Sequence, residues 1–295
     1  MNIVLARTFL EILENGNFNK AAQRLNVTQS TVTMRVNALE SIVGQQLFVR
    51  NRTGAELTSA GVKFRRYAEL LVQVWQQAQQ EIALPKDLSG TITIGVDPHL
   101  WEGPVESWLL WLRRELPELA VSARVGEPAA LLRGLSHGLL DVVVEYNPHT
   151  RPGFCVEKIF DERLVLVSDT PRKRVKWHPL YVFVDWGEEF RKVHSVAFPD
   201  EQTPGVSVQH GRWALNFIME YGGSGYFPLR LVERHLAEGR LFLVPESREF
   251  ARVVHVGYAG KTRDSPWFAK ALAGLHALSA PYAEPPRASP RLLVF

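Results

Sequence analysis

The sequence predicts an α+β chain of several domains, with a small helical domain first, a long connecting helix next and a larger two-lobed α/β part last. Three observations support this prediction. Two capped helices stand close together within residues 19–43, an apolar seam runs through residues 59–84, and strand and helix patterns alternate from residue 91 onward. A length of 295 residues leaves room for two or three domains.

Composition and charge exclude several classes of protein. Hydrophobic residues make up 46% and charged residues 22% of the chain, which describes a globular protein rather than a disordered one. The formal net charge of +3 permits nucleic-acid binding without requiring it. Cys155 is the single cysteine, so no intrachain disulfide can form, which fits a reducing compartment. Because the N-terminus shows no secretory signal and no apolar run approaches the ~20 residues of a membrane helix, we expect a cytoplasmic protein with no membrane partner.

Residues 1–43 carry the pattern of three short helices. Apolar side chains recur at helical spacing within residues 5–13 and again within residues 32–43. Asn19 and Thr28 are residue types that cap helix N-termini, because their side chains accept from free backbone N–H groups. The spacing therefore predicts a helix, a tight turn and a second helix, preceded by one further helix.

The helix that begins after Thr28 turns a polar face away from its apolar stripe. Small hydroxyl and amide side chains on such a face can hydrogen-bond base edges in the DNA major groove, and a methionine can contact thymine methyl groups. We therefore expect base contacts from Gln29, Ser30, Thr33, Met34 and Asn37. Taken alone the polar face would fit a solvated helix better, and it is the neighbouring basic segment and apolar seam that favour DNA binding.

A basic segment follows this helix. Residues 44–58 contain glycine, a basic centre at Arg50 and Arg52, and flanking apolar residues that predict a small β-wing. The first domain is thus expected to be a winged helix-turn-helix over residues 1–58. Side chains around the polar face can contact phosphates, which gives affinity without sequence information. The expected DNA backbone contacts are Thr28, Thr31, Arg35, Arg50, Arg52 and Lys63.

A long helix is predicted over about residues 59–84, ended by Pro85. Its apolar positions step alternately by four and three residues, an average that is typical of a coiled coil. The seam consists of Phe64, Ala68, Leu71, Trp75, Ala78 and Ile82. Two interpretations stay open: pairing of two chains along the seam, which makes a homodimer, or packing of the helix on its own domain. Residues 59–88 are assigned to a dimerisation helix and a hinge.

From residue 91 the pattern is that of two α/β lobes within residues 89–280. Strands at 91–96, 121–125 and 142–146 alternate with helices near 104–116 and 129–139, which is the rhythm of a parallel sheet. A second run has strands at 164–167, 181–184, 195–198, 206–208, 225–227 and 241–244, with helices near 212–221 and 229–238. A strand at 253–258 and a helix at 266–279 follow.

The first lobe is expected to span about residues 91–160 plus 265–280, and the second lobe about residues 161–264. Residues 281–295 contain four prolines and are expected to form an extended or disordered tail.

Loops after the predicted strands hold aromatic and ionisable side chains. In open α/β sheets, ligands bind at the carboxyl ends of strands and often between lobes. We therefore expect a small molecule to contact Asp97, His99, Leu100, Trp101, Glu127, Tyr146, Asn147, Trp186 and His210. The acidic residues in these loops, which favour a cationic or amphoteric ligand, are Asp97, Glu102, Glu127 and Asp185. The alternative is that such acids are partners for His99 and Arg151.

Enzymatic motifs are weak in this chain. Gly222–Tyr226 resembles a nucleophile elbow, but a tyrosine stands where the motif requires its second glycine. The same segment fails as a dinucleotide loop, because Pro228 stands where a third glycine is needed. The nine histidines show no metal-ligand spacing. We therefore expect no enzyme, no metal and no cofactor other than a small co-inducer.

One set of residues is more specific than any of these patterns. Its N-terminal members are Thr8–Leu10, Gly16–Phe18, Ala21-Ala22, Leu25, Thr28–Ser30, Val32-Thr33, Leu39-Glu40, Gly44, Leu47-Phe48, Arg50 and Leu57–Gly61, and its later members are Leu132–Val144 and Gly223–Pro228. With these residues the chain resembles the LysR-type transcriptional regulators along nearly its whole length. Leu100–Glu102 and Asp185–Gly187 resemble a branch of that family which includes a repressor of the flagellar master operon.

The resemblance implies a winged helix-turn-helix, a linker-helix dimer and a two-lobed effector domain of the periplasmic-binding-protein type. It also implies dimers of dimers on promoter DNA and a co-inducer between the lobes, and it leaves RNA polymerase open as a partner. Two positions depart from the family pattern. Met34 stands where arginine is common, and Asp97-Pro98-His99 stands where serine or threonine is frequent, so base preference and effector are expected to differ. A ligand-binding or enzymatic protein with an incidental helical arm is the rival, and it would not bind DNA.

Overall fold

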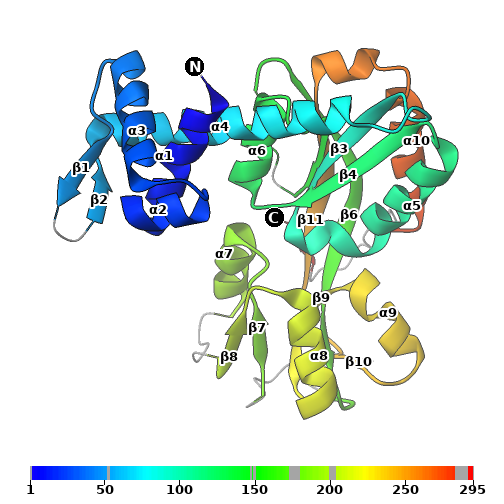
Figure 1. Ribbon diagram of the computed structural model, residues 1–295. Coiled ribbons are helices and arrows are strands. Elements are labelled where there is room, and N and C mark those ends of the chain that lie inside the picture. Colours follow the sequence, from blue (N-terminus) through cyan, green and yellow to red (C-terminus); the bar gives the residue numbers. More distant parts are fainter. Residues whose placement is uncertain are drawn as a thin grey trace. The chain divides into compact units, whose positions relative to one another are not determined.

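The computed structural model describes residues 2–51, 54–146, 148, 151–172, 180–198, 204–282 and 292–294, with the backbone alone at Arg50 and at 292–294. Two compact units are present, Met1–Asp87 and Leu88–Phe295. Figure 1 shows their elements, coloured from blue to cyan in the first unit and on to red in the second. None of the described helices is long and apolar enough to cross a membrane.

The first unit combines helices with a small antiparallel wing. Its elements are α1 (Ile3–Asn15), α2 (Phe18–Arg24), α3 (Gln29–Val43), β1 (Phe48–Asn51), β2 (Gly54–Leu57) and α4 (Ser59–Ile82). Thr28 caps α3 as predicted, since its side chain accepts from the N–H of Thr31. The N-cap of α2 is Asn17 rather than the predicted Asn19. The side chain of Asn17 accepts from the backbone N–H of Asn19 at 2.7 Å. The helix begins earlier than predicted because Phe18 packs into the core.

Side chains from the helices and the wing meet in the core of the first unit. Phe9 of α1 packs against Phe48 of the wing and Phe64 of α4, with ring centroids 5.0 and 5.1 Å apart. Glu40 of α3 accepts from the backbone N–H groups of Leu47 and Phe48 through one carboxylate oxygen. Each fully buried side chain of this kind contributes ~2 kcal/mol, so this core fixes which face of α3 remains outside.

The second unit is an α/β arrangement around a twisted sheet. Its strands and helices are β3 (Gly90–Val96), α5 (Glu106–Glu115), β4 (Leu119–Val125), α6 (Pro128–Ser136), β5 (Val142–Glu145), β6 (Phe154–Ser168), β7 (Val182–Val184), α7 (Glu188–Ala197), β8 (Val206–Val208), α8 (Gly211–Tyr221), β9 (Ser224–Pro228), α9 (Leu229–Ala237), β10 (Phe242–Leu243), β11 (Glu249–Ala259), α10 (Phe268–Ser279) and β12 (Leu292–Val294). Short turns of 3-10 or π type occur at Pro98–Leu100, Trp101–Val105, Gly260–Asp264 and Ala280–Tyr282. The strand order of the sheet is β10-β6-β11-β5-β3-β4, and β7 pairs with β8 apart from it.

The long antiparallel strands β6 and β11 join two lobes (Figure 1). Their register runs from Phe250 opposite Leu164 to Ala259 opposite Phe154. Near one end β11 also pairs with β5, which continues into the parallel strands β3 and β4. Near the other end β6 pairs with β9 and β10. We call the part around β3, β4 and β5 the first lobe and the part around β7, β8 and β9 the second lobe.

Each lobe has an apolar core of its own. In the first lobe β3 and β5 pack against α5 and α10, and the indole N–H of Trp108 donates to the carbonyl of Ala271 at 2.8 Å. The second core is rich in aromatic rings, and His194 is buried among them beside Phe190 and Tyr226. Burial lowers the pKa of His194 to about 4, so this ring is a neutral core residue.

Two predicted strands are different in the structure. The segment at 195–198 belongs mainly to the end of α7, in which Phe190, His194 and Ala197 bury one helical face. The strand at 164–167 is the end of the much longer β6, whose earlier part carries charged residues that hid the strand pattern. In the proline-rich tail, β12 lies parallel to the start of β11.

We expect Gly61→Ala to destabilise the first unit. A Cβ at this position would lie 2.1 Å from the carbonyl oxygen of Leu47, so α4 would have to move away from the wing. Alanine otherwise favours a helix over glycine by about 1 kcal/mol, so a lower urea midpoint would report the steric conflict. Gln73→Ala, at an exposed position of the same helix, is the control and should leave the midpoint nearly unchanged. An unchanged midpoint for Gly61→Ala would contradict the close contact.

Candidate functional site

The polar face of α3 forms an open hollow on the first unit. The hollow has a volume of about 480 Å³ and is lined by Gln29, Ser30, Thr33, Met34 and Asn37. These are the residues predicted to contact bases, and the structure brings all of them together. Met34 is 64% exposed although it is apolar, whereas Val32, Val36 and Leu39 of the same helix are buried. The face that would meet DNA is thus free of any role in core packing.

Hydroxyl groups gather at the N-terminus of α3. Thr28 Oγ1 accepts from the N–H of Thr31 at 3.2 Å and lies 2.8 Å from the hydroxyl oxygens of both Ser30 and Thr31. A helix N-terminus attracts phosphate, because its first N–H groups point outward and its dipole favours negative charge. The predicted phosphate contacts Thr28 and Thr31 are therefore placed where a phosphate would be stabilised.

The cations predicted to contact phosphates are placed unequally. Lys63 is exposed on α4. Arg35 is half-buried and donates to the hydroxyl of Thr8 on α1 at 3.4 Å, so it is directed toward its own unit. Arg52 and the side chain of Arg50 lie outside the described residues. Among the described cations of this set, Lys63 is therefore the one that has the exposure a phosphate contact needs.

The apolar seam of α4 divides into two halves. Phe64 and Ala68 pack with the core of the first unit, so at these two positions the structure favours the interpretation in which the helix packs on its own domain. The second half consists of Leu71, Trp75, Ala78 and Ile82. Leu71, Trp75 and Ile82 are 38%, 46% and 86% exposed. Apolar side chains gathered on an exposed helix indicate an interaction surface.

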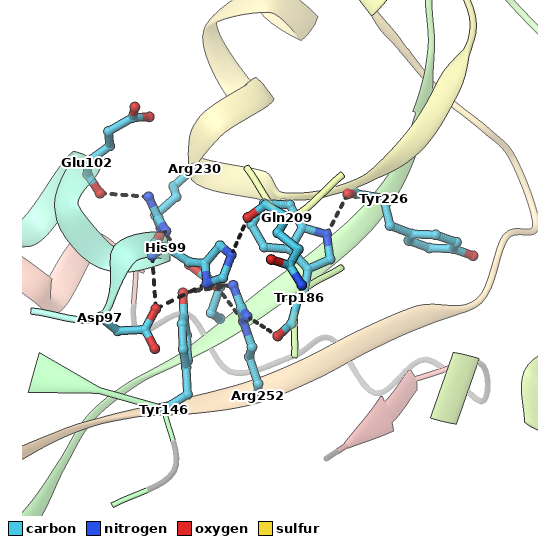
Figure 2. A network of polar contacts seen from close by, with 10 residues as sticks. Asp97, His99, Glu102, Tyr146, Trp186, Gln209, Tyr226, Arg230 and Arg252 are labelled. Atoms are coloured by element: carbon cyan, nitrogen blue, oxygen red, sulfur yellow. Dashed lines mark hydrogen bonds and ion pairs between the residues drawn. The ribbon is translucent and has the colours of Figure 1, made fainter. Parts of the chain in front are cut away.

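A buried charged network lies in the second unit where the lobes meet (Figure 2). Its centre is Glu162 of β6, which is 3% exposed. One carboxylate oxygen accepts from Arg230 at 2.5 Å, and the other lies 2.6 Å from Arg252. Tyr146 donates its hydroxyl to this second oxygen at 2.7 Å. Burial raises the pKa of Glu162, but the two guanidinium groups outweigh burial and lower the pKa to about 2.

Arg252 of β11 contacts both lobes. Its guanidinium lies 3.6 Å from the ring centroid of Tyr146, at the end of β5 in the first lobe. It donates to the Tyr146 hydroxyl at 2.8 Å and to the backbone carbonyl of Trp186, which follows β7 in the second lobe, at 3.2 Å. Burial raises the pKa of Tyr146, so its hydroxyl keeps the proton that it donates. The strand that joins the lobes thus carries a cation bonded to each of them.

Arg230, in the first turn of α9, reaches from the second lobe to the first. Its terminal nitrogens donate to the backbone carbonyls of His99 and Glu102 at 2.5 and 2.6 Å. These carbonyls belong to the irregular chain after β3, where Gly103 has a φ of 93° and Pro104 precedes α5 rather than opening it. A positive φ suits glycine, which has no Cβ. The turn is therefore held by the guanidinium of Arg230. Figure 2 shows Arg230 beside His99 and bonded to Glu102.

His99 makes a further contact between the lobes. Its Nδ1 lies 3.1 Å from a carboxylate oxygen of Asp97, and its Nε2 lies 3.1 Å from the backbone carbonyl of Gln209. Asp97 belongs to the first lobe and Gln209 to the second, so the ring connects the two lobes. The ring meets Trp186 edge-on at a centroid distance of 5.2 Å. Asp97 is therefore a partner of His99, which is the alternative that the sequence left open.

A cavity of about 330 Å³ opens between the lobes beside this network. Much of its wall comes from the chain after β3, β7 and β8 and from the last residue of β4, the position at which open α/β sheets bind ligands. The lining residues are Pro98, His99, Trp101, Glu102, Val125, Trp186, Gln209, His210, Gly211, Arg212 and Leu231. Arg212 of the second lobe donates to Glu102 of the first at 2.8 Å.

The structure places the predicted effector contacts differently from one another. Those that line the cavity are His99, Trp101, Trp186 and His210. Asp97 and Tyr146 belong to the polar network instead. Leu100 is 1% exposed in the first core, so its predicted contact with a ligand is corrected: the turn directs this side chain inward. Glu127 precedes α6 and is not part of the lining, and Asn147 lies outside the described residues.

Three of the four acids that suggested a cationic or amphoteric ligand are paired inside the chain, and the fourth, Glu127, does not line the cavity. Asp97 pairs with His99, and Glu102 pairs with Arg212. Asp185 lies 2.5 Å from Arg191 and also accepts from a backbone N–H. Among the described residues no cluster of acids, histidines and cysteines is arranged to hold a metal ion.

Sequence reasoning missed the residues that join the lobes, namely Glu162, Arg212, Arg230 and Arg252. A signal was present for two of them. Glu162 and Arg252 stand just before the predicted strands 164–167 and 253–258, and a charge that is buried beside such a strand is stable only when it is paired. Arg230 and Arg212 carry no such signal, because each lies on an ordinary amphipathic helix.

A winged helix-turn-helix with an open polar face, joined to a two-lobed unit with a cavity between its lobes, defines a ligand-responsive transcriptional regulator. Residues 3–62 match the model of the bacterial regulatory helix-turn-helix proteins of the lysR family, and residues 85–277 match the LysR substrate binding domain. The chain belongs to the LysR family of transcriptional regulators, which confirms the resemblance seen in the sequence. It is a DNA-binding regulator with an effector-binding domain and not an enzyme.

The chain is similar in sequence or in fold to several known regulators. The HTH-type transcriptional regulator HdfR of Escherichia coli O45:K1 is 28% identical over 258 residues, which cover 86% of this chain and 91% of the relative. CbnR complexed with its target DNA has a TM-score of 0.71 at 19% identity, covering 94% of this chain and 99% of CbnR. LysG of Corynebacterium glutamicum with the effector Arg bound has a TM-score of 0.54 at 18% identity, covering 97% and 100%. These structures show a common fold.

We expect Arg230→Met to lower the free energy of unfolding of the second unit by about 3–5 kcal/mol, because it removes one partner of a buried ion pair. Chemical denaturation followed by tryptophan fluorescence measures the change. Arg234→Met is the matched control, since Arg234 lies on the same helix with 84% of its side chain exposed. Equal effects of the two substitutions would contradict the structural role of Arg230.

Glu145 gives the second unit a dependence on pH. Its burial, together with the carboxylate of Asp97, raises its pKa from 4.5 to about 7. The folded chain therefore binds this proton more tightly than the unfolded chain, and stability falls as pH rises from 4.5 to about 7. We expect Glu145→Gln to raise the free energy of unfolding at about pH 8 by about 1–3 kcal/mol and to change it little near pH 4.5. Urea titrations at both pH values would refute this if the variant gained equally at each.

Proposed function

We propose that the chain binds promoter DNA as a homodimer, with α3 in the major groove, and that a small effector between the lobes changes this binding. The observation that carries the proposal is the open polar hollow of α3. Two relatives support its two parts, since CbnR is seen with its target DNA and LysG with the effector Arg. We infer that the chain acts in the cytoplasm, where promoter DNA is found.

Base reading falls to the residues that line the hollow. Ser30 and Thr33 can donate to or accept from base edges, and Gln29 and Asn37 can do both at once. Met34 offers an apolar surface that suits the methyl group of thymine. An arginine at this position would instead favour guanine, so Met34 gives this regulator a base preference of its own.

Phosphate binding orients the unit on the duplex. Thr28 and Thr31 stand at the N-terminus of α3, and Lys63 is exposed on α4. We include Arg50 and Arg52 among the proposed phosphate contacts, because a basic wing beside the reading helix can reach the DNA backbone. Arg35 is more engaged with α1, so its contribution would be smaller.

Dimerisation is assigned to the second half of the α4 seam. Leu71, Trp75, Ala78 and Ile82 recur at coiled-coil spacing on a helix whose first half is already used by its own core. Pairing along this half would bury the exposed indole of Trp75 and place two reading helices on one DNA molecule.

The effector part of the proposal rests on the contacts between lobes. A ligand can shift DNA binding only if it binds two states of the protein with different affinity. The cavity has walls from both lobes, and bonds such as that between Arg212 and Glu102 cross it. A ligand in the cavity would therefore strengthen or break these bonds, and that difference can be transmitted to the sheet strands β6 and β11.

We expect Thr33→Val to weaken binding by ~1–3 kcal/mol at the base pairs that Thr33 contacts and to leave other base pairs unaffected, because valine lacks the hydroxyl but keeps the shape. Gel shifts with the intergenic DNA upstream of the gene, and with single base-pair variants of it, measure this. Lys63→Ala is the contrasting control, for which we expect a uniform loss across sequences and a salt slope reduced by ~1. A uniform loss for Thr33→Val would argue against a reading role.

We expect Trp75→Glu to separate the dimer, because pairing would bury a charge in an apolar seam. Static light scattering should show the molar mass of the wild-type assembly halved. Gln73→Glu adds the same charge at an exposed position two residues away and should leave the mass unchanged. A Trp75→Glu variant with the wild-type mass would exclude this half of α4 as the dimer interface.

A further inference from the structure

We propose that the effector of this regulator is a small aromatic carboxylate with a single ring, bound between Trp101 of the first lobe and Trp186 of the second, with its carboxylate toward Arg212. The inference rests on the proposed function, in which the cleft binds an effector, and it adds the size, the shape and the sign of charge of that effector.

The size follows from the space that the charged network leaves. Arg230, Arg252 and Glu162 occupy the end of the cleft next to the joining strands, and the side chain of each is no more than 3% exposed. A cavity of about 330 Å³ remains beside them. Ligand pockets in proteins span roughly 300–1,000 Å³, so this one stands at the lower limit and suits one ring with a short polar substituent.

The shape follows from the walls. The indole N–H of Trp186 donates to the carbonyl of Tyr226 at 2.8 Å, which fixes the plane of the ring. The other side of this ring system packs on Gly211, where an added Cβ would lie 2.3 Å from the indole. Of the two tryptophans that line the cavity, Trp101 is 37% exposed and Trp186 is 4% exposed, and Val125 adds an aliphatic surface. Rigid aromatic walls favour a flat aromatic ligand, because stacked and edge-on contacts add to the gain from apolar burial.

The sign of charge follows from what is already paired. Three of the four acids of the cleft loops have partners inside the chain: Asp97 has His99, Glu102 has Arg212, and Asp185 has Arg191. The fourth, Glu127, is not part of the cavity lining. A cationic ligand would have to displace one of these partners before it could bind. Displacing a bonded cation costs its interaction energy, so a cation gains little at this site.

The groups that remain for a ligand are donors. Nδ1 of His210 accepts from the N–H of Trp213 at 3.2 Å, so in a neutral ring Nε2 carries the proton. Nε of Arg212 donates to the carboxylate of Glu102. In the described part of the chain no acceptor is seen at the two terminal nitrogens of Arg212. Since α8 begins at Gly211, its N-terminus adds positive potential on the same side. A carboxylate matches these donors, and an arginine can bind it through two nitrogens at once.

The test compares three probes that share a ring and differ in charge. Full-length protein is titrated with benzoate, benzamide and benzylamine, by calorimetry and by thermal unfolding. We expect benzoate to bind and to raise Tm, benzamide to bind more weakly, and benzylamine not to bind. Benzylamine or benzamide binding as tightly as benzoate would overturn the assigned charge, and failure of all three to bind would overturn the aromatic class.

Variants locate the binding. Arg212→Gln removes the proposed carboxylate partner and should weaken benzoate ~10- to 100-fold, the range of a hydrogen bond to a charged group. The same variant frees Glu102, so benzylamine should gain affinity relative to wild type. Trp101→Ala should weaken the binding of benzoate and benzamide, whereas Arg234→Gln, on an exposed part of α9, should change the binding of no probe. Benzoate affinity unchanged in Arg212→Gln would exclude this orientation.

A second experiment distinguishes failure of the ligand class from failure of the proposed function. Gel shifts with promoter DNA are run with and without benzoate. DNA binding without any probe binding refutes the ligand class and leaves the regulator assignment intact. Benzoate binding that alters the DNA complex supports both proposals, and benzoate binding that leaves the complex unchanged refutes its role as an effector.

Discussion

The architecture of the second unit depends on keeping one buried carboxylate paired. Glu162 lies on the strand that joins the lobes, and an isolated charge there would be too costly to keep. Arg230 and Arg252 pair with it from α9 and β11, and each also bonds to backbone carbonyls on other elements. The chain after β3 and the chain after β7 are therefore held around the same carboxylate. The cavity between the lobes has its size because this network fills the rest of the cleft.

In the first unit it is apolar side chains, rather than a charged network, that hold the elements together. Phe9, Phe48 and Phe64 hold α1, the wing and α4 together, and the buried stripe of α3 faces them. The outer face of α3 has no part in this packing, so it is free to carry polar side chains that suit DNA. The same core takes up the first half of the α4 seam and leaves Trp75 exposed. One core thus separates the face of α3 that we propose for DNA from the part of α4 that we propose for a partner chain.

Pairing decides the character of the effector cleft more than composition does. Acidic residues are frequent in the loops after the strands, and by number they suggest a cationic ligand. In the structure Asp97 and Glu102 are satisfied by His99 and Arg212. A ligand meets the groups that are left, which are nitrogen donors and indole rings. The charge of the ligand that a site prefers therefore depends on the groups that are not already paired.

Local patterns in the sequence were enough to predict the first unit and the α/β nature of the second. Caps, helical stripes and strand alternation are set by neighbours a few residues apart, so the polar face of α3 was identified residue by residue. Contacts between distant segments decided the rest. Arg252 meets Glu162 across 90 residues and Arg230 meets His99 across 131, and no local spacing encodes such pairs. Whether Leu100 faced the cleft or the core, and which half of the seam stayed exposed, also depended on which surfaces the folded chain had already buried.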